Sequence, residues 1–308
     1  MLVSVIVVTY NSSRYVLETL ESVCRQSYSD IELIVSDDCS KDNTLDICQQ
    51  WIETNRKRFV KATVIQTVKN SGICGNYNFA LRYASGDWIK YIAGDDILED
   101  NCIERFVANI KPDTFLYTCI TKHLQYETGE FTLYSTRIPD QTAWWQARYM
   151  LKYLYGINGP TLFVERQHLI DLGGFEEKYP MIEDWPIAIR FATNGLRIGI
   201  VNEPLVQWRI YGDSISHSNH SFAVSLHNAW YDYTLRYCWK YFLPFHHYHY
   251  WLNNLISKHE NKSFSFKLLG YILRCFDLVN YKRKLLPIPQ EPYNKIKYDT
   301  QNNSLLLV

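Results

Sequence analysis

The sequence lacks several features that would place it in well-known classes of protein. Its eight cysteines show no C-x-x-C spacing, which argues against a structural zinc site. No run of 18 or more apolar residues is present, so we expect no transmembrane helix. Lys plus Arg and Asp plus Glu are equal, at 32 each, so no net charge indicates nucleic acid as a partner. No G-x-G-x-x-G follows the first strand pattern, which disfavours a dinucleotide-binding dehydrogenase.

The N-terminus also lacks a targeting signal. Residues 2–10 (L-V-S-V-I-V-V-T-Y) have the character of a strand, with no basic region and no cleavage site. We therefore expect a cytoplasmic protein whose thiols are reduced. At 308 residues the chain fits one large α/β domain with an appendage, or two domains.

The first 110 residues alternate between strand-like and helix-like patterns. The strands are predicted at Val3–Thr9, Ile31–Ser36, Ala62–Gln66 and Trp88–Ala93, and the helices at 14–26, 42–58 and 75–84. Continuous runs of β-branched residues are typical of strands that are buried on both faces. Strand and helix in alternation at this spacing predict a mostly parallel, doubly wound sheet flanked by helices.

Residues 111–216 have a mixed pattern, and we expect them to complete the same domain. Strands are predicted at 114–120, 131–135, 161–165, 197–201 and 205–210, and helices at 143–155, 166–172 and 182–193. The helix at 143–155 is broken by Asn158-Gly159-Pro160, and the helix at 166–172 stops at Gly173-Gly174.

Residues 217–308 differ in kind from the rest of the chain. Trp, Tyr and Phe fill eleven of the 22 positions in 230–251, and six Lys or Arg accompany a single acid in 262–284. This pattern predicts a helical, aromatic and basic extension that binds an anionic membrane surface. The alternative is a helical pack that covers the main domain. We interpret His246, His247 and His249 as surface or interface residues rather than ligands.

Three pairs of adjacent carboxylates stand at the ends of the predicted elements. Asp37–Asp38 ends the second strand, Asp95–Asp96 ends the fourth, and Glu183–Asp184 begins a helix. The carboxyl ends of parallel strands share one edge of a sheet, so we expect the first two pairs to face one crevice and the third to line its opposite wall. Neighbouring carboxylates suit Mg²⁺ or Mn²⁺, although Asp and Gly are also ordinary turn residues. The set suits a nucleotide diphosphate attacked by an alcohol, with a metal at the leaving diphosphate and a carboxylate as base.

Six segments carry a resemblance to a known family, and they occur in that family's order. They are V-S-V-I-V-V-T-Y-N (3–11), E-L-I-V-S-D-D-C-S-K-D-N-T (32–44), N-S-G-I-C-G-N-Y-N-F-A-L (70–81), G-D-W-I-K-Y-I-A-G-D-D (86–96), G-G-F-E (173–176) and E-D-W-P-I-A-I-R (183–190). Over roughly residues 1–216 the chain resembles family 2 glycosyltransferases of the GT-A fold. The resemblance implies a Rossmann-like domain with a nucleotide-sugar half (1–110) and an acceptor half (111–216).

The resemblance also implies a role for each matching residue. The nucleotide-binding positions would be Thr9, Tyr10, Asn11, Asp37, Asp38, Asn70 and Asp95. Among them Asp38 would contact the nucleobase. Outside that set, Asp96 would bind Mn²⁺ or Mg²⁺, and Asp184 would be the catalytic base. The alternatives are structural, because Asp38 would equally cap a turn and Asn70 is a common turn residue. Glu183 and Asp184 would equally favour a helix N-terminus.

The closing segment, Trp208–Ser216, departs from the family pattern. It resembles R-x-H-x-x-S-x-S, but Tyr211 stands where His is common, so a metal or diphosphate role at that position is open. Arg209 is expected to meet diphosphate charge. The segment Gln207–Arg209 lacks the Q-x-x-R-W spacing of processive synthases, which favours the transfer of a single sugar.

Taken together, these features predict a metal-dependent inverting glycosyltransferase. The donor would be a nucleotide-diphosphate sugar, with UDP the default by resemblance and dTDP and GDP open. The acceptor would be a lipid-linked saccharide of O-antigen or capsule assembly, met on the inner face of the cell membrane. Two alternatives stay open: an inactive protein that binds nucleotide-sugar as a scaffold, and a nucleotidyltransferase on a similar sheet.

Overall fold

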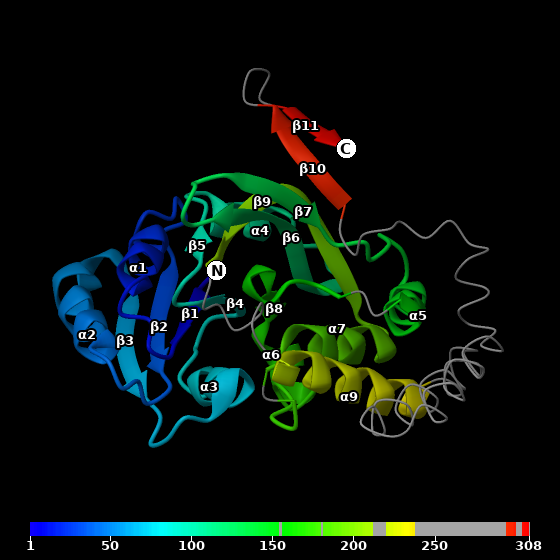
Figure 1. The fold of residues 1–308 in the computed structure, drawn as a ribbon, viewed down its shortest axis with the longest axis horizontal. Coiled ribbons are helices and arrows are strands. Elements are labelled where there is room, and N and C mark those ends of the chain that lie inside the picture. Colours follow the sequence, from blue (N-terminus) through cyan, green and yellow to red (C-terminus); the bar gives the residue numbers. More distant parts are fainter. Residues whose placement is uncertain (154–155, 180, 212–219, 238–293, 300–303, 308) are drawn as a thin grey trace, which may run out of the picture.

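The computed structural model describes residues 1–153, 156–179, 181–211, 220–237, 294–299 and 304–307 (Figure 1). Its strands are β1 (Val3–Thr9), β2 (Ile31–Asp37), β3 (Lys61–Gln66), β4 (Trp88–Ala93), β5 (Ile97–Leu98), β6 (Thr114–Gln125), β7 (Phe131–Ser135), β8 (Phe163–Glu165), β9 (Arg197–Ile210), β10 (Asn294–Asp299) and β11 (Ser304–Leu307). Its helices are α1 (Val16–Cys24), α2 (Thr44–Asn55), α3 (Gly72–Leu81), α4 (Cys102–Ala108), α5 (Ala143–Tyr153), α6 (Arg166–Asp171), α7 (Asp184–Thr193) and α9 (His220–Tyr237). Short 3₁₀ turns cover Arg56–Arg58 and Gly159–Thr161.

The strands of the described residues form one mixed sheet in the order β11-β10-β7-β6-β8-β4-β1-β2-β3, with β9 joining β6 and β5. Pairing is parallel between β4, β1, β2 and β3 and again between β6 and β9. It is antiparallel where β8 joins β4 to β6 and where β7 and β10 continue the sheet. This confirms the predicted α/β fold with a mostly parallel sheet in its first half.

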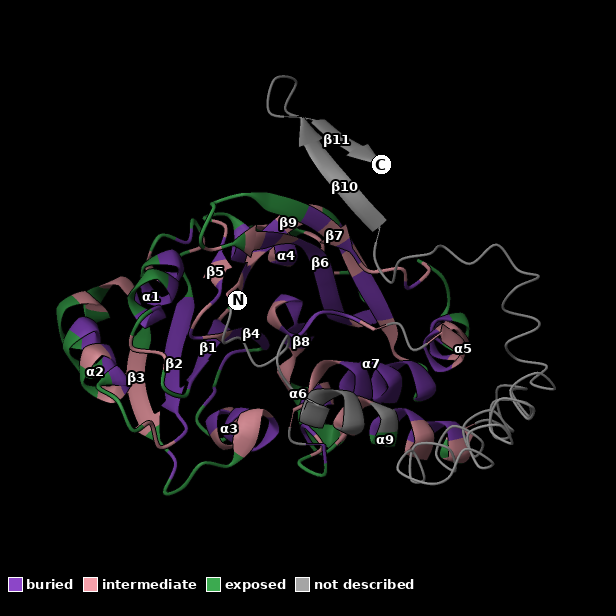
Figure 2. Ribbon diagram, viewed as in Figure 1, coloured by how far each residue is buried: buried purple, intermediate pink, exposed green. Residues whose placement is uncertain are grey.

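Helices cover both faces of the sheet, and each face has its own apolar core (Figures 1 and 2). Alternate residues of β1 point to opposite faces, so Val5 and Val7 pack with α1, α2 and α4, whereas Ile6 and Val8 pack with α3, α5, α7 and α9. Every residue of β1 and β2 is buried, as the unbroken apolar runs predict.

The predicted boundaries agree with the structure where the signal is local and differ where it is not. The predicted strand at 88–93 is confirmed as β4, and the one at 131–135 as β7. The strands predicted at 197–201 and 205–210 are one strand, β9. Its register against β6 shifts because Val201 and Pro204 of β9 pair with consecutive residues of β6. Helix α4 and strand β5 were not predicted.

The C-terminal extension contains strands as well as a helix. Helix α9 covers part of the aromatic segment, and Trp230 and Tyr233 are buried against the main domain. The last residues form β10 and β11, an antiparallel hairpin that extends the sheet beside β7, so the extension is not helical throughout. The predicted basic helix at 262–284 lies outside the described residues. Within the described residues, no helix is both long and apolar enough to cross a membrane.

Strand β1 is the place where the chain changes direction across the sheet. The connection from β1 leads to β2 on one side, and β4 later pairs with the other side of β1. Ligands of open α/β sheets bind at such a point, in the crevice beyond the carboxyl ends of the strands. Both acidic pairs of the nucleotide half follow strands that flank β1, which places them at this edge.

Candidate active site

The loops after β1, β2 and β4 are joined directly to one another. The amide of Gly94 donates to the carbonyl of Val8 (2.8 Å), and the amide of Asp38 donates to the carbonyl of Thr9 (2.8 Å). Gly94 has to lack a side chain, because a Cβ atom there would lie 2.7 Å from the methyl carbon of Thr9. The acids after β2 and β4 are therefore fixed on the two sides of the end of β1.

Asp37 is held entirely by protein donors. Its carboxylate accepts hydrogen bonds from Thr9 Oγ1 (2.9 Å), the Ser40 amide (2.9 Å) and Gln66 Nε2 (3.0 Å). Thr9 and Asp37 are buried, and together they support the turn that follows β1. Their predicted contact with a nucleotide stays a prediction.

The turn after β1 is exposed and is fastened to the loop after β2. Asn11 adopts a left-handed conformation (φ 51°), its side-chain oxygen accepts from the Lys41 amide (2.7 Å), and its own amide donates to Ser40 Oγ (2.9 Å). Tyr10 is 43% exposed beside it. The turn is therefore open to solvent, and its predicted contact with a nucleoside stays a prediction.

Asp38 caps helix α3 from a distance. Its carboxylate accepts from the amides of Ser71 (2.9 Å) and Gly72 (2.9 Å), from Ser71 Oγ (2.8 Å) and from Thr67 Oγ1 (2.8 Å). Those amides would otherwise lack partners, since the first turn of a helix leaves its N–H groups unpaired. This explains why α3 begins three residues before its predicted start. Asn70 is exposed and accepts from the Gly72 amide (3.2 Å), so it acts as a turn residue here.

Asp95 and Asp96 are held at the end of β4 by residues of β9 and the segment after it. The Tyr211 hydroxyl donates to Asp95 Oδ2 (2.7 Å), and the Arg209 amide donates to Asp96 Oδ1 (3.0 Å). Burial raises the pKa of both carboxyls, and the charge of Asp95 raises the pKa of Asp96 further, well above its usual range. Tyr211, at the position where the resemblance expects His, thus holds the first acid of the pair.

The Arg209 side chain is buried in an aromatic sandwich. Its guanidinium carbon lies 4.9 Å from the Tyr15 ring centre and 5.1 Å from that of Tyr126, and Nη2 donates to Glu18 Oε2 (2.9 Å). Nε and Nη1 have no hydrogen-bond partner, and the side chain is 1% exposed. Its positive charge nevertheless lowers the pKa of Asp95 and Asp96. The predicted diphosphate contact of Arg209 stays a prediction.

Glu183 and Asp184 begin α7 and pack against the 3₁₀ turn at Gly159. A Cβ atom on Gly159 would lie 2.0 Å from Glu183 Oε1, so only glycine fits there. The Trp185 amide donates to Asp184 Oδ1 (2.6 Å), and the Gly159 amide acts on Asp184 by lowering its pKa. From the sequence, Asn158-Gly159-Pro160 predicts only a helix break, and the Gly-Pro pair after a helix is the one local signal of this closer role.

Burial raises the pKa of both Glu183 and Asp184, but to different values. It raises the pKa of Asp184 to about 6, an effect that the Trp185 and Gly159 amides oppose. Burial, with the charges of Asp184 and then Asp96, raises the pKa of Glu183 to about 8. Two neighbouring carboxyls whose pKa values are driven apart are a common sign of acid–base chemistry.

The four acids at β4 and α7 form one electrostatic cluster. The charge of Asp96 raises the pKa of Glu183. Burial raises the pKa of the Tyr77 hydroxyl of α3, and the charges of Glu183, Asp96 and Asp95 raise it further. We call Asp95, Asp96, Glu183 and Asp184 the acid cluster. The charge of Asp96 thus reaches the third acidic pair, whereas Asp37 and Asp38 follow β2, on the other side of β1 from β4, in contacts of their own. That the first two pairs face one crevice with the third on its opposite wall stays a prediction.

The acid cluster fits a divalent cation that is shared with a substrate. Among the described residues no group of three or more His, Cys, Asp or Glu side chains is arranged to hold a metal by itself. Mg²⁺ and Mn²⁺ are commonly bound by one or two carboxylates with substrate phosphates completing the shell. Asp96, with Asp95 beside it, supplies the protein part of such a shell, and burial, joined for Asp96 by the charge of Asp95, raises the pKa of these carboxyls.

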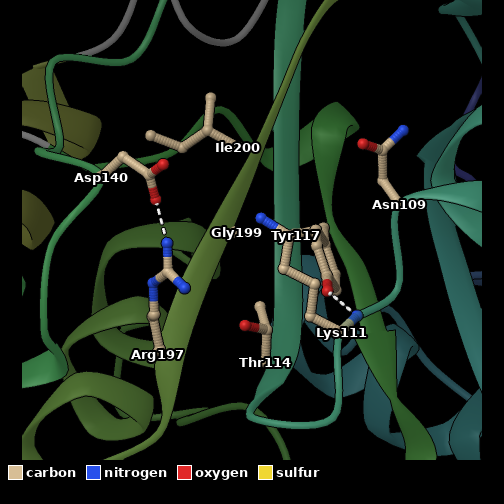
Figure 3. A pocket seen from close by; sticks show the side chains of 8 residues that line it. All are labelled: Asn109, Lys111, Thr114, Tyr117, Asp140, Arg197, Gly199 and Ile200. Atoms are coloured by element: carbon tan, nitrogen blue, oxygen red, sulfur yellow. Dashed lines mark hydrogen bonds and ion pairs between the residues drawn. The ribbon is translucent and has the colours of Figure 1, made fainter.

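A small polar hollow lies away from this site. Arg197, Asp140, Thr114 and Tyr117 line it at the start of β6 and β9 (Figure 3). Arg197 bonds Asp140, and the Tyr117 hydroxyl accepts from the Lys111 amide (2.7 Å). Strand β6 runs in the same direction as β4, so its start is at the opposite edge of the sheet from the acid cluster. The hollow takes no part in the chemistry considered below.

Comparison with known families matches residues 4–167, just over half of the chain, to the family described as Glycosyl transferase family 2. The chain belongs to glycosyltransferase family 2. It is therefore an enzyme of the glycosyltransferase class that depends on a nucleotide-sugar. The matched residues contain β1 to β4, the Asp37–Asp38 and Asp95–Asp96 pairs and the turn at Gly159, whereas Glu183 and Asp184 lie beyond them.

Relatives of this family-2 glycosyltransferase include bacterial proteins of low identity. The Bacillus subtilis (strain 168) protein EpsE is 29% identical over 229 residues, which cover 74% of this chain and 79% of the relative. An Escherichia coli protein named UDP-Glc:alpha-D-GlcNAc-diphosphoundecaprenol beta-1,3-glucosyltransferase WfaP is 25% identical over 223 residues, 70% of this chain and 80% of the relative.

Solved structures share the fold of this glycosyltransferase. Residues 1–349 of S. aureus TarS, in complex with UDP-GlcNAc, superpose with a TM-score of 0.58 at 18% identity, covering 100% of this chain and 99% of the other. The mannosyltransferase PcManGT of Pyrobaculum calidifontis, in complex with GDP-Man and Mn²⁺, gives 0.58 at 17% identity and covers 92% of this chain and 82% of that one. These likenesses confirm the GT-A-like fold.

The cap on α3 predicts that Asp38 contributes to stability. Asp38→Ala removes the acceptor of two helix amides and two hydroxyls, so unfolding should cost about 1–3 kcal/mol less. The exposed Asp46→Ala, in the first turn of α2, is a matched control that should change stability by less than about 0.5 kcal/mol. Urea denaturation of the three proteins measures both effects. Equal stability of Asp38→Ala and the parent would contradict the capping role.

The raised pKa of Glu183 predicts that the metal-free protein becomes less stable as pH rises. The folded protein holds this proton up to about pH 8, whereas the unfolded chain releases it near pH 4.5, so stability declines between these values. Glu183→Gln should remove that part of the decline and, above pH 8, stabilise the protein by about 1 kcal/mol, or about 2–4 °C in Tm. Thermal unfolding in EDTA from pH 5 to pH 9 measures the difference. Parallel curves for the two proteins would contradict it.

Proposed function

We propose that this enzyme moves one sugar from a UDP-sugar to a hydroxyl of a lipid-linked saccharide, with a divalent metal and with inversion at the anomeric carbon. The observation that carries the proposal is the acid cluster, in which a pair suited to a metal lies in electrostatic contact with a pair suited to proton transfer. A nucleotide-diphosphate sugar attacked by an alcohol needs both parts.

Asp184 is the better base of its pair at neutral pH. With a pKa of about 6 it is mostly ionised, yet basic enough to take a proton from an attacking hydroxyl. Glu183, with a pKa of about 8, is mostly protonated at the same pH. A protonated neighbour leaves the negative charge on Asp184 and is itself able to donate a hydrogen bond.

The donor diphosphate would lie between Asp96 and the end of β9. The metal, when bound, would neutralise charge on the leaving diphosphate. Asp96 would hold it and Asp95, fixed by Tyr211, would lie near the ribose or donor sugar. The two unpaired N–H groups of Arg209 favour an anionic partner close by. Asp184 would then take the proton of the acceptor hydroxyl while the acceptor oxygen bonds the anomeric carbon and the nucleoside diphosphate leaves. No covalent enzyme intermediate is needed.

Relatives support the choice of donor and acceptor. WfaP is named for transfer from UDP-Glc to a sugar on a diphosphoundecaprenol lipid, and TarS was crystallised with UDP-GlcNAc. A lipid-linked acceptor of this kind belongs to cell-surface polysaccharide assembly of the O-antigen or capsule type. We therefore propose that the sugar transfer takes place at the inner face of the cell membrane.

Helix α5 has an outer face suited to that location. Trp144 and Trp145 are 39% and 48% exposed, and the Arg148 guanidinium carbon lies 5.5 and 5.7 Å from their ring centres. Lys152 Nζ lies 4.7 Å from the Tyr153 ring centre, and the helix carries no acid. Aromatic rings beside cations are typical of helices at an anionic membrane surface. Helix α9, which leads into the basic and aromatic part of the sequence, packs against α5 through Trp230.

A panel of UDP-, dTDP- and GDP-sugars tests the proposal directly. With Mn²⁺ and a lipid-diphosphate saccharide, the parent should release nucleoside diphosphate from one UDP-sugar and add one sugar of inverted configuration. EDTA or Asp96→Ala should abolish release. Release of pyrophosphate would favour the nucleotidyltransferase alternative. Binding of a donor without any turnover would favour the inactive scaffold.

The role of Asp184 predicts a pH profile as well as a loss of activity. Asp184→Asn should lower kcat by about 10²–10⁴-fold while the donor still binds, since only the proton acceptor is removed. In the parent, kcat should fall as pH drops through about 6, because Asp184 becomes protonated. Steady-state kinetics from pH 5 to pH 9 measures both effects. Unchanged kcat in Asp184→Asn would remove it as the base.

The outer face of α5 predicts a contribution to membrane binding. Trp144→Ser with Trp145→Ser should bind vesicles of phosphatidylglycerol and phosphatidylcholine about 10-fold more weakly than the parent, since two rings that would be buried in the membrane surface are lost. Leu17→Ser with Tyr83→Ser, at positions 47% and 44% exposed elsewhere, is the matched control and should bind like the parent. Sedimentation with vesicles gives the affinities. Equal binding of the two double variants would refute a membrane role for α5.

A further inference from the structure

Lys90 is a buried cation in the middle of β4, in a strand that is otherwise apolar. Its side chain has no exposed surface, and its neighbours in the strand are Ile89 and Tyr91. Among its described contacts there is no carboxylate, and Nζ donates to two carbonyl oxygens, those of Tyr91 (2.6 Å) and Pro160 (2.5 Å). Charged groups are rarely buried without a reason, because leaving water is costly for them. Neither the fold nor the proposed base and metal ligand explains this residue.

The Pro160 carbonyl belongs to the 3₁₀ turn Gly159–Thr161, which is fastened from several sides. Thr161 Oγ1 shares a hydrogen bond with Thr118 Oγ1 of β6 (2.6 Å), and Asn158 Nδ2 donates to Thr121 Oγ1 (2.9 Å). Lys90 attaches the same turn to β4, six residues before Asp96. The turn is therefore a bridge between β4, which leads to the metal-binding pair, and β6, which lies beyond β8 in the sheet.

The other side of this turn contacts the base. Gly159 lies so close to Glu183 that a methyl group would not fit, and its amide lowers the pKa of Asp184. A chain of contacts therefore runs from Lys90 Nζ to the Pro160 carbonyl, through the turn, and from Gly159 to the two acids of α7.

We propose that Lys90 is a positioning residue, which fixes the Gly159–Pro160 turn against Asp184 and sets the spacing between the base and the metal-binding pair. The inference rests on the proposed roles of Asp184 and Asp96. Lys90 touches no substrate in this arrangement, so it acts through the turn. The need for accurate spacing explains why a costly buried charge is kept, since small displacements of a catalytic group have large effects on rate.

Two substitutions separate the charge of Lys90 from its hydrogen bonds. Lys90→Met removes both, whereas Lys90→Gln retains an N–H donor for the Pro160 carbonyl without the charge. Glu32→Gln is the matched control, because Glu32 is also a fully buried charge in the sheet, but it bonds Ser4 and Ser85 near the start of β1. All variants are made in the full chain, and their unfolding temperatures are measured first.

In turnover, Lys90→Met should lower kcat about 10–100-fold with the donor KM within about 2-fold of the parent. The fall of kcat in acid should move to higher pH, because the Gly159 amide no longer stabilises ionised Asp184. Lys90→Gln should fall between Lys90→Met and the parent. Glu32→Gln should change the unfolding temperature alone. A folded Lys90→Met with the kcat and pH profile of the parent overturns the proposal.

A second measurement does not depend on turnover. Carboxyl-carbon NMR titration of the metal-free protein, with the Asp184 signal assigned by its loss in Asp184→Asn, should show Asp184 titrating at higher pH in Lys90→Met than in the parent. Identical titration curves overturn the positioning role even if no donor or acceptor is found. A shifted curve in a protein that never transfers sugar would support the role of Lys90 and refute the proposed function. If Lys90→Met does not fold, Lys90→Gln decides by the same two measurements.

Discussion

The burial of four neighbouring carboxyls is the constraint to which the rest of the site responds. Asp95, Asp96, Glu183 and Asp184 have raised pKa values because they share a desolvated space, and the fold does not neutralise them completely. It holds them with amides, a phenol and a buried guanidinium, all of which donate or attract without adding bulk at the centre. Burying four carboxyls at this edge of the sheet lowers the stability of the fold, a cost that proteins commonly accept where a site needs such groups. A bound cation and diphosphate would remove most of that cost.

Much of the first half of the fold follows from local pattern. The apolar runs of β1 and β4 end in Gly, Asp or Asn, and their limits agree with the sequence because a fully buried strand needs no partner-specific signal. The three acidic pairs were found for the same reason, since strand ends and helix starts can be recognised locally. Parallel topology places only the first two pairs at one edge of the sheet, whereas the electrostatic contact between Asp96 and Glu183 depends on where α7 packs.

Other parts depend on contacts between residues that are distant in sequence, which local patterns do not reveal. Helix α3 begins at Gly72 because Asp38, 34 residues earlier, accepts its first amides. Strand β10 pairs with β7 across more than 150 residues, so a chain end that favours no regular structure by composition still becomes a strand. Gly159 and Lys90 look like a helix break and an irregularity in an apolar run until their partners are known.

The contacts of Arg209 link the end of β9 to residues far earlier in the chain, so they form late as the chain folds. Its amide holds Asp96, 113 positions earlier, and its side chain pairs with Glu18, 191 positions earlier. A nascent chain that has emerged only as far as β8 can already pair β1 to β4 and bury much of the core on one face, as domains commonly do during synthesis. It cannot yet fix the acid at the end of β4. This edge of the sheet is therefore completed late, when β9 joins it, so an incompletely made chain would be compact before Asp96 was fixed.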